Sequence, residues 1–573
     1  MCLSAIEGPL AIGSTLCCLM VGWELLILSW YAMELFANLV CGNASDLNHF
    51  VVDWERYHKG CNAESLLSGV ITLRNKVKVE CKSLHDIEWG LEFSLNRNAN
   101  YLWLYSLDYV GTLVDAYSRG FGEIYLDCAI SIVESFCRFY HESEGNKTKV
   151  AYLNKSGASY DHATSTRANV LVRYLCAVIK SDRKVDLSPV ISCIHDAAIF
   201  MYDDRNHSES NHGVMTDIAL SQIGVLAGLS NELGRVFFEK ANDRLIDSVL
   251  RTFDSDGYAN ENTVGYHRFN VQLFKSVISK FSDWGVESRF GDIAPPIIDK
   301  ALRAFQICVW QDGSIPPIGD SAVYENAAES LNISKVFSES GMAVIKDDDL
   351  YVSLICGRRG DAHKQVDDTS ITVRYKNTDI VIDGGHLSYD RLDPHRLSLE
   401  SSLGHSGIFP EFIEGIPSHS YLAVKQAASI TNISKNDASV DISAQLSFPD
   451  HGYAVNRTVS VIFPRLIVIR DEVDSENCEM QTTQRFLFGK NLNEIEFNQP
   501  GVLTLHDKNF RVVVTMKEVS SGLTLCRGLV GERPRGWSSQ KSGIKDPCYE
   551  LTQKAIGGKL LFETCIEIID TQL

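Results

Sequence analysis

Residues 453–461 read Tyr-Ala-Val-Asn-Arg-Thr-Val-Ser-Val, and this stretch decides the class of fold. Its larger side chains occupy every second position, which is the period of a β-strand with one buried face. Similar strand-like runs lie on both sides of it, at residues 371–375, 466–470, 510–516 and 560–562. The sequence therefore predicts antiparallel strands from about residue 340 onward.

Between about residues 50 and 325 the apolar period changes to steps of three and four, which is typical of helices. Three such series are Leu102, Tyr105, Tyr109 and Leu113; Val214, Ile218, Val225 and Leu229; and Ile298, Leu302, Phe305 and Val309. Pro295 and Pro296 suit a helix start, so we expect the third helix to begin there. Helices followed by strands indicate separate layers or domains, not a parallel α/β sheet.

The composition is that of a globular protein with two or three domains. The chain has 573 residues, of which 45% are hydrophobic and 22% charged. The formal net charge of −19 argues against a general nucleic-acid-binding protein, which would need a basic face. It leaves room for a locally basic cleft that binds an acidic ligand. The 16 Cys form no CxxC pair, which favours reduced, buried thiols over a disulfide framework.

Residues 1–48 form an apolar N-terminal segment that fits no standard targeting signal. Glu24 and Glu34 interrupt its apolar run, and the first Lys or Arg is Arg56, so the basic start of a secretory signal is missing. A poor membrane anchor, an atypical export signal, a buried helix and an extension from a wrongly chosen start codon remain open. We favour the last two and expect no stable membrane insertion.

Two polar clusters precede helical patterns. Residues 206–213 read Asn-His-Ser-Glu-Ser-Asn-His-Gly, which would place amide and imidazole donors at a helix N-terminus, where an anion is favoured. Residues 261–268 read Glu-Asn-Thr-Val-Gly-Tyr-His-Arg, and a Tyr beside a cation has a lowered pKa and can act as an acid or base. The alternative for each is an ordinary capped helix start.

Two further clusters accompany strands. Residues 361–368 read Asp-Ala-His-Lys-Gln-Val-Asp-Asp, just before the strand at 371–375. Asp383-Gly-Gly-His386 follows another strand, with Tyr389 and His405 further on. His and Asp at strand ends are plausible metal ligands, and the alternative is hydrogen-bonded loop residues.

Taken in order, these clusters resemble the heparinase II/III-like family of polysaccharide lyases. The matching motifs are Asn211-His-Gly213, Gly265-Tyr-His-Arg268, Pro317-Ile-Gly-Asp-Ser321, His363-Lys-Gln-Val-Asp-Asp-Thr-Ser370, Asp383-Gly-Gly385, the later His405, and Arg457 with the run that ends at Asp471 and Val473. The resemblance implies an α+β multidomain protein. An incomplete (α/α) toroid over residues 49–335 would precede an antiparallel β-sandwich over 336–573, with the active site in the cleft between them.

The resemblance also implies site residues for β-elimination at a uronic acid. Asn211 and His363 would hold the substrate carboxylate, and His212 and Tyr266 would be the base and the acid, or Tyr266 would do both. Tyr389 would be a second phenolic acid. Arg268 would orient the carboxylate or lower the pKa of Tyr266, and His267 would contact substrate or support the loop.

A structural zinc ion is the cofactor that the resemblance implies, held here by Gln365, Asp383 and His405. The family usually has His where this chain has Gln365. Zinc prefers imidazole and thiolate, so we expect the metal to be weak, replaced or absent.

The expected partner is an acidic polysaccharide or oligosaccharide, and the expected activity is that of a carbon–oxygen lyase. Alternatives are a uronyl C5-epimerase with the same residues and a non-catalytic carbohydrate-binding protein. The family is mostly bacterial and lies in the cell envelope or is secreted, whereas the thiols and the missing basic start favour the cytoplasm. The sequence does not identify the uronate polysaccharide or the oligomeric state.

Overall fold

The computed structural model describes residues 63–94, 97–144, 160–181, 183–492, 494–517 and 522–571, so the predicted apolar segment at 1–48 lies outside the described residues. Contacts divide the chain into two units. The helical unit comprises Met1–Ser248 and Ser276–Ile293, and the sandwich unit comprises Val249–Lys275 and Ala294–Leu573. Two helical pieces before residue 335 therefore group with the strands, although we predicted the domain boundary after that residue.

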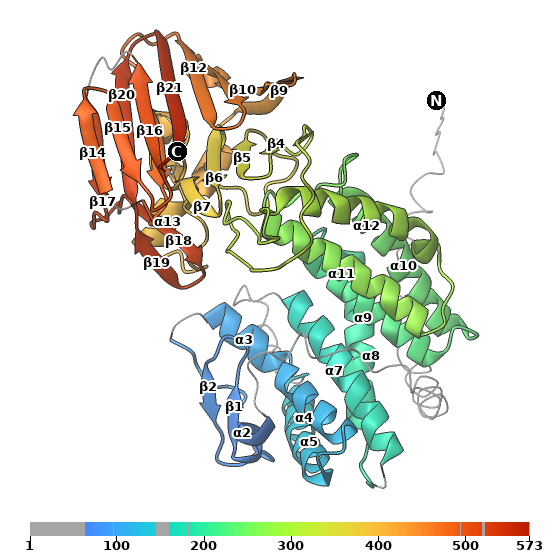
Figure 1. Cartoon of the computed structure of the whole chain (residues 1–573). Coiled ribbons are helices and arrows are strands. Elements are labelled where there is room, and N and C mark those ends of the chain that lie inside the picture. The colour runs from blue at the N-terminus through green and yellow to red at the C-terminus, as the bar shows by residue number, and fades with distance from the viewer. Residues whose placement is uncertain are drawn as a thin grey trace, which may run out of the picture. The chain divides into compact units, whose positions relative to one another are not determined.

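The helices of the helical unit pack on sequence neighbours, as α4 does on α5 and α7 does on α8, and also on more distant helices, as α7 does on α9 (Figure 1). A short hairpin of β1 (Val70–Thr72) and β2 (Lys78–Glu80) accompanies them. The helices that lie wholly or partly in this unit are α2 (Ala63–Leu67), α3 (Arg97–Tyr105), α4 (Asp108–Ser118), α5 (Glu123–Glu144), α7 (Tyr160–Lys180), α8 (Ser188–Tyr202), α9 (Asn211–Ala227), α10 (Glu232–Thr252), α11 (Val264–Asp283) and α12 (Arg289–Cys308).

Two helix predictions need correction. The first apolar series spans two helices, because Leu107 takes a left-handed conformation with φ 55° between α3 and α4. Helix α12 begins at Arg289, not at Pro295, so both prolines lie inside it. A proline removes one backbone donor, and two adjacent prolines in the second turn leave the rest of this 20-residue helix intact.

Two antiparallel sheets form the sandwich unit. One has the strand order β14-β15-β16-β21-β12-β11-β10-β9, and the other has the order β17-β20-β13-β7-β6-β5-β4-β3, with β8 paired to β13. The first sheet is built from β9 (Ala427–Lys435), β10 (Ser439–Phe448), β11 (Tyr453–Ile462), β12 (Leu466–Ser475), β14 (Glu494–Gln499), β15 (Val502–His506), β16 (Phe510–Lys517) and β21 (Lys559–Asp570). The second is built from β3 (Lys335–Phe337), β4 (Met342–Lys346), β5 (Leu350–Ile355), β6 (Ser370–Tyr375), β7 (Thr378–Ile382), β8 (Ile408–Pro410), β13 (Gln481–Phe488), β17 (Leu523–Arg527) and β20 (Tyr549–Ile556).

One hydrophobic core contains residues of both sheets, such as Val373 of β6 and Val455 of β11. Strand β11 alternates buried and more exposed residues along its length, as the period of two predicted. The strand-like runs at 371–375, 466–470, 510–516 and 560–562 lie in β6, β12, β16 and β21. The predicted fold class, helices followed by an antiparallel β-sandwich, is confirmed.

A buried ion pair lies inside this core. Arg457 and Asp471 face each other across β11 and β12 and form two hydrogen bonds of 2.6 Å, with no solvent exposure. The same guanidinium donates to the carbonyl of Thr369 at 2.5 Å, and Gln484 donates to Asp471. The pair therefore fixes the end of the loop before β6 to the opposite sheet.

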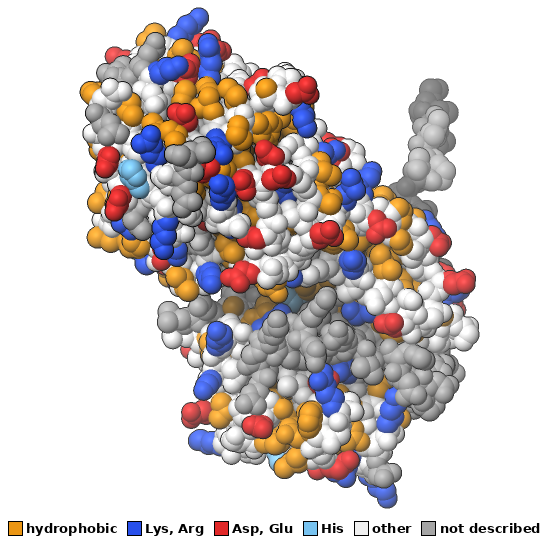
Figure 2. Space-filling model, in the orientation of Figure 1, with side chains coloured by type: hydrophobic (Ala, Val, Ile, Leu, Met, Phe, Trp, Pro, Cys, Tyr) orange, Lys and Arg blue, Asp and Glu red, His pale blue; other side chains and the backbone are white. Residues whose placement is uncertain are grey.

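The surface carries both signs of charge. Figure 2 shows Lys and Arg side chains interspersed with Asp and Glu over the face of the sandwich unit that is in view. The net negative charge is thus not gathered into one acidic patch on that face. Among the described residues, no helix has the length and the apolar composition that crossing a membrane requires.

We expect Arg457→Met to lower the free energy of unfolding by about 3–5 kcal/mol, because it leaves Asp471 charged and without its partner in the core. Urea denaturation measures the change. The matched control is Arg470→Met on β12, whose side chain is 52% exposed in a surface pair with Glu472 and which should change stability by less than about 1 kcal/mol. Equal effects of the two substitutions would contradict the structural role of the buried pair.

Candidate functional site

Tyr266 lies in the first turn of α11, within the predicted Gly-Tyr-His-Arg motif. The backbone NH of Gly265 donates to the hydroxyl of Ser321 at 2.8 Å, and a Cβ on Gly265 would lie 2.9 Å from that hydroxyl. A larger residue at 265 would therefore press against Ser321. This contact joins the Gly-Tyr-His-Arg motif to the Pro-Ile-Gly-Asp-Ser motif, two segments that the sequence separates by 56 residues.

The loop that carries His363 is tied to the segment before α11. The amide nitrogen of Asn262 donates to the carbonyl oxygens of Gly360 and Ala362 at 2.7 and 2.8 Å. His363 itself has φ 58°, in the left-handed region that costs an L-residue on the order of 1–3 kcal/mol. The hydrogen bonds from Asn262 therefore anchor the backbone next to His363.

Three predicted site residues come together in the sandwich unit. The ring of His363 stacks on the ring of Tyr266, with centroids 3.5 Å apart and an angle of 19°. The hydroxyls of Tyr266 and Tyr389 lie 2.6 Å apart and share a hydrogen bond. Tyr389 is 64% exposed, whereas Tyr266 is half-buried. Two phenols and one imidazole thus form a continuous group that reaches solvent through Tyr389.

Asp320 lies beneath this group, although we assigned it no role from the sequence. One carboxylate oxygen faces Nδ1 of His363 at 3.2 Å, and the other faces Nδ1 of His386 at 3.3 Å. Burial alone would raise the pKa of Asp320, but the hydrogen bonds from both histidines and the charge of Arg396 hold it far below the usual range. Since an ionised carboxylate only accepts hydrogen bonds, both imidazoles carry a hydrogen on Nδ1.

Glu261 is a second carboxylate beside His363. Its Oε2 atom lies 3.4 Å from His363 Nε2, and its Oε1 atom accepts a hydrogen bond from Asn270 at 3.0 Å. His363 therefore lies between two acidic side chains, one at each ring nitrogen. The sequence analysis missed four residues of this site, which are Glu261, Asp320, His386 and Arg396. The first three lie inside or beside the quoted motifs, and that position was the available signal.

The environment of Tyr266 corrects one expectation. Burial, followed by the nearby Tyr389, Asp320 and Glu261, raises the pKa of Tyr266 well above its usual value of 10. We expected Arg268 to lower this pKa. Arg268 stacks on the ring of Tyr324 at 4.1 Å. It lies two positions after Tyr266 in the same helix, and side chains two positions apart point in nearly opposite directions. Tyr266 is consequently a neutral phenol, suited to donate a proton.

His267 is a structural residue and does not contact solvent. Its Nδ1 accepts from the backbone NH of Ala259 at 3.0 Å, and its Nε2 donates to the carbonyl of Ala301 at 2.8 Å. Burial lowers the pKa of His267 to about 4, although the bond to Ala301 acts in the opposite direction. The predicted substrate contact by His267 is therefore wrong, and its alternative role, support of the loop, fits the structure.

The Asp-Gly-Gly-His segment owes its two glycines to close backbone contacts. A Cβ on Gly384 would lie 2.8 Å from the carbonyl of Gly404, and one on Gly385 would lie 2.3 Å from that of Ser539. Gly385 also has φ 70°, which favours glycine. The hydroxyl of Ser539 donates to the carbonyl of His386 at 2.9 Å. This packing fixes the segment from which His386 and Tyr389 extend.

The predicted zinc ligands do not fit a zinc site. Asp383 accepts from the backbone NH groups of Gly319 and Gly385 at one oxygen and from His405 Nδ1, at 2.8 Å, at the other. Gln365 donates to Asp320 at 2.6 Å. In the part of the chain that the structure describes, no three His, Cys, Asp or Glu side chains are arranged to hold a metal ion. His405 Nε2 and Gln365 Oε1 are buried without a hydrogen-bond partner there, which is short of the four ligands that zinc takes.

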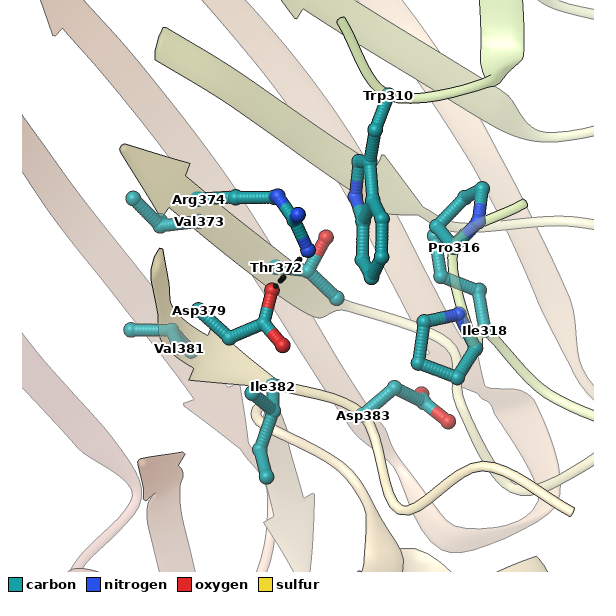
Figure 3. A pocket seen from close by; sticks show the side chains of 11 residues that line it. Trp310, Pro316, Ile318, Thr372, Val373, Arg374, Asp379, Val381, Ile382 and Asp383 are labelled. Atoms are coloured by element: carbon teal, nitrogen blue, oxygen red, sulfur yellow. Dashed lines mark hydrogen bonds and ion pairs between the residues drawn. The ribbon is translucent and has the colours of Figure 1, made fainter. Parts of the chain in front are cut away.

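A pocket of the sandwich unit adjoins Asp383 from another side (Figure 3). Trp310 and Arg374 lie in its wall, stacked 3.6 Å apart, and the charge of Arg374 is neutralised by Asp379 at 2.9 Å. The lining includes none of Tyr266, His363 and Tyr389. This pocket is therefore separate from the group of phenols and imidazoles.

Asn211 and His212 lie in the helical unit, in the first turn of α9. The N-cap is Ser210, whose side chain accepts from the backbone NH of His212, so Asn211 is not the cap. A Cβ on Gly213 would lie 1.8 Å from the carbonyl of Ser208, which explains why this motif ends in glycine. The Asn211 side chain makes no hydrogen bond to any residue that the structure describes. Its predicted role stays a prediction.

His212 has two polar neighbours in α7. Its Nδ1 atom lies 3.4 Å from a carboxylate oxygen of Asp161, and its ring centroid lies 5.1 Å from that of His162. Burial and the neighbouring His212 lower the pKa of His162 to about 4, so His162 is neutral at physiological pH. The carboxylate of Asp161 orients the ring of His212, as a base in catalysis requires.

Solved structures of a heparan sulfate lyase and of heparinase III share this fold. A mutant of heparan sulfate lyase HepC from Pedobacter heparinus has a TM-score of 0.65 at 13% identity, covering 89% of this chain and 83% of that chain. A heparinase III gene product has a TM-score of 0.65 at 14% identity, covering 89% and 84%. Another heparinase III has a TM-score of 0.66 at 14% identity, covering 84% and 79%. No protein-family model matches the sequence, and no curated protein matches it. The expected architecture of a toroid and a sandwich is confirmed.

We expect purified protein to contain less than one zinc ion per chain, because Gln365 is engaged by Asp320 and supplies only a weak neutral oxygen. Metal analysis after dialysis measures the content. The comparison variant is Gln365→His, which introduces the imidazole that the family pattern has at this position and should raise the zinc content. One tightly bound zinc ion per chain in the unaltered protein would show that our interpretation of Gln365 is wrong.

Proposed function

We propose that this protein is a polysaccharide lyase that cleaves a uronic-acid-containing polysaccharide or oligosaccharide by β-elimination. The observation that carries the proposal is the contact between the Tyr266 and Tyr389 hydroxyls at 2.6 Å, beside a stacked imidazole. A phenol with a raised pKa keeps its proton and can transfer it to a leaving oxygen. The shared fold of heparan sulfate lyase and heparinase III supports the same reaction class.

The reaction has three parts. A base removes the proton on C5, the electron pair forms the C4–C5 double bond, and the O4 leaving group departs with a proton. Negative charge develops on the uronate carboxylate, and donors aimed at it contribute the largest share of the acceleration. In our proposal Tyr266 protonates O4, and His363 helps to hold the carboxylate.

Asn211 and His212 complete the proposed mechanism as carboxylate donor and base. His212 suits the second role because the neighbouring Asp161 carboxylate orients its ring. Tyr389 would return a proton to Tyr266 after each turnover, since its exposed hydroxyl is hydrogen-bonded to Tyr266. Arg268, which stacks on Tyr324, has no place in this scheme.

The experiment that tests the function compares the unaltered protein with Tyr266→Phe on a panel of heparin-like, alginate-like and capsular uronates. We expect the unaltered protein to release unsaturated uronate, seen as ultraviolet absorbance, and the variant to lose at least about 10²-fold in rate because the acid is gone. Phe269→Leu, one turn further along α11, is the control for changes in packing. Equal rates for Tyr266→Phe and the unaltered protein would remove Tyr266 from the mechanism.

The pH dependence tests the protonation state of Tyr266. A proton donor acts only below its pKa. Because the pKa of Tyr266 is raised, loss of its proton should not lower the rate up to pH 10. Tyr389 is one cause of that increase, so Tyr389→Phe should move the alkaline decline of the rate to lower pH. A profile of kcat/KM for both proteins measures this. A decline that stays in place, or moves upward, would contradict the assigned role.

A further inference from the structure

Four side-chain donors converge on the carboxylate of Asp320. Gln365, His386 and Arg396 face one oxygen at 2.6, 3.3 and 3.2 Å, and His363 faces the other at 3.2 Å. The donors come from the loop before β6, the segment after β7 and helix α13 (Pro394–Glu400). The Asp320 side chain is only 7% exposed, so protein donors replace most of its water.

Asp320 thereby links two pairs of aromatic rings. His363 stacks on Tyr266, and His386 lies 4.5 Å from the ring of Tyr389 at an angle of 50°. The two phenols are themselves hydrogen-bonded at 2.6 Å. Asp320, His363, Tyr266, Tyr389 and His386 therefore form a closed ring of contacts. A displacement of either imidazole moves the phenol that packs against it.

Gln365 has a different task from the metal ligand that the resemblance implies. Its amide NH₂ group makes the shortest of the four contacts with Asp320, and its side chain is 1% exposed. A neutral amide satisfies the carboxylate without adding a further charge. The residue that differs from the family pattern thus completes the hydrogen bonding of Asp320.

We propose that Asp320 is a positioning residue. Its carboxylate, whose hydrogen bonding Gln365 completes, sets the tautomer and orientation of both imidazoles. It also holds in place, without a metal ion, the segment between β7 and α13 that carries Tyr389, here called the Tyr389 loop. The geometric part stands without the proposed function, whereas its consequence for catalysis rests on that function. Because the carboxylate only accepts, each ring keeps a hydrogen on Nδ1, and the Nε2 atom of His363 faces Glu261 Oε2 at 3.4 Å.

Asp320→Asn tests this proposal. An amide has one oxygen and one NH₂ group, so one of the two imidazoles must face a donor and move its hydrogen to Nε2. Nitrogen NMR of the imidazoles distinguishes the two tautomers, and His363→Asn and His386→Asn assign the signals. We expect the signal of at least one of the two histidines to change to the other tautomer. Unchanged signals for both would overturn the proposal.

The Tyr389 loop supplies a second readout that needs no activity. Arg391 is exposed in this loop and offers trypsin a cleavage site before Leu392, which is 88% exposed. Asp320→Asn removes the negative charge that faces His386 and Arg396. We therefore expect cleavage after Arg391 to be at least about tenfold faster in this variant, the effect of losing one charged hydrogen bond. An unchanged rate of cleavage would overturn the proposal for the loop.

The matched control is Asp312→Asn in the same unit. Asp312 pairs with Arg374 at 3.0 Å and its side chain is 36% exposed, so the substitution removes a carboxylate away from the two imidazoles. Both readouts should stay as in the unaltered protein. A control that changes them equally would show that they report general destabilisation, and the proposal would fail.

If Asp320→Asn does not fold, Gln365→Ala takes its place, because it removes one of the four donors and leaves the carboxylate. We expect faster cleavage after Arg391 in this variant too. An unchanged cleavage rate would overturn the proposal. With a substrate in hand, Asp320→Asn should lower kcat by about 10²-fold with little change in KM, the scale of a small misplacement. If the unaltered protein has no lyase activity but Asp320→Asn still shifts a tautomer, the proposed function is contradicted and the positioning role stands.

Discussion

A carboxylate with little access to water is the constraint on which the site depends. Asp320 is charged and 7% exposed, and leaving such a group without partners would cost several kcal/mol. The chain meets this demand with donors from three segments: Gln365 and His363 before β6, His386 after β7, and Arg396 in α13. Once these donors face Asp320, the imidazoles have little freedom. The phenols of Tyr266 and Tyr389 then follow, because each packs against one of the two rings.

Much of the fold was predictable because burial leaves a periodic trace in the sequence. The alternation at residues 453–461 marks β11, and its buried Arg457 was visible as the one charged member of the inward series. Helix boundaries were less predictable, because Leu107 and the prolines of α12 depend on local backbone conformation. The division into units was also not predictable, since it reflects contacts between helical segments and strands that lie far apart in the chain.

The candidate site was predictable in its motifs but not in the roles of single residues. Tyr266 and His363 were both identified as site residues, and their rings are stacked. His267 and Arg268 follow Tyr266 in the sequence, yet a helix turns each of them in another direction, so one is buried against backbone and the other stacks on Tyr324. Gln365 looked like a lost metal ligand because its partner, Asp320, is 45 residues away. Such pairings follow from tertiary structure alone.

We propose that the two phenols take part in elimination at a uronic acid. The most direct measurement is the mass of the products after incubation with uronate polysaccharides in heavy water. We expect shortened chains in which each cleavage leaves one new non-reducing end that is lighter by one water than the same end after hydrolysis. Uptake of deuterium at C5 of chains that stay uncleaved would contradict it and indicate an epimerase. Chains that stay uncleaved and unlabelled with every uronate offered would contradict any chemistry at this site.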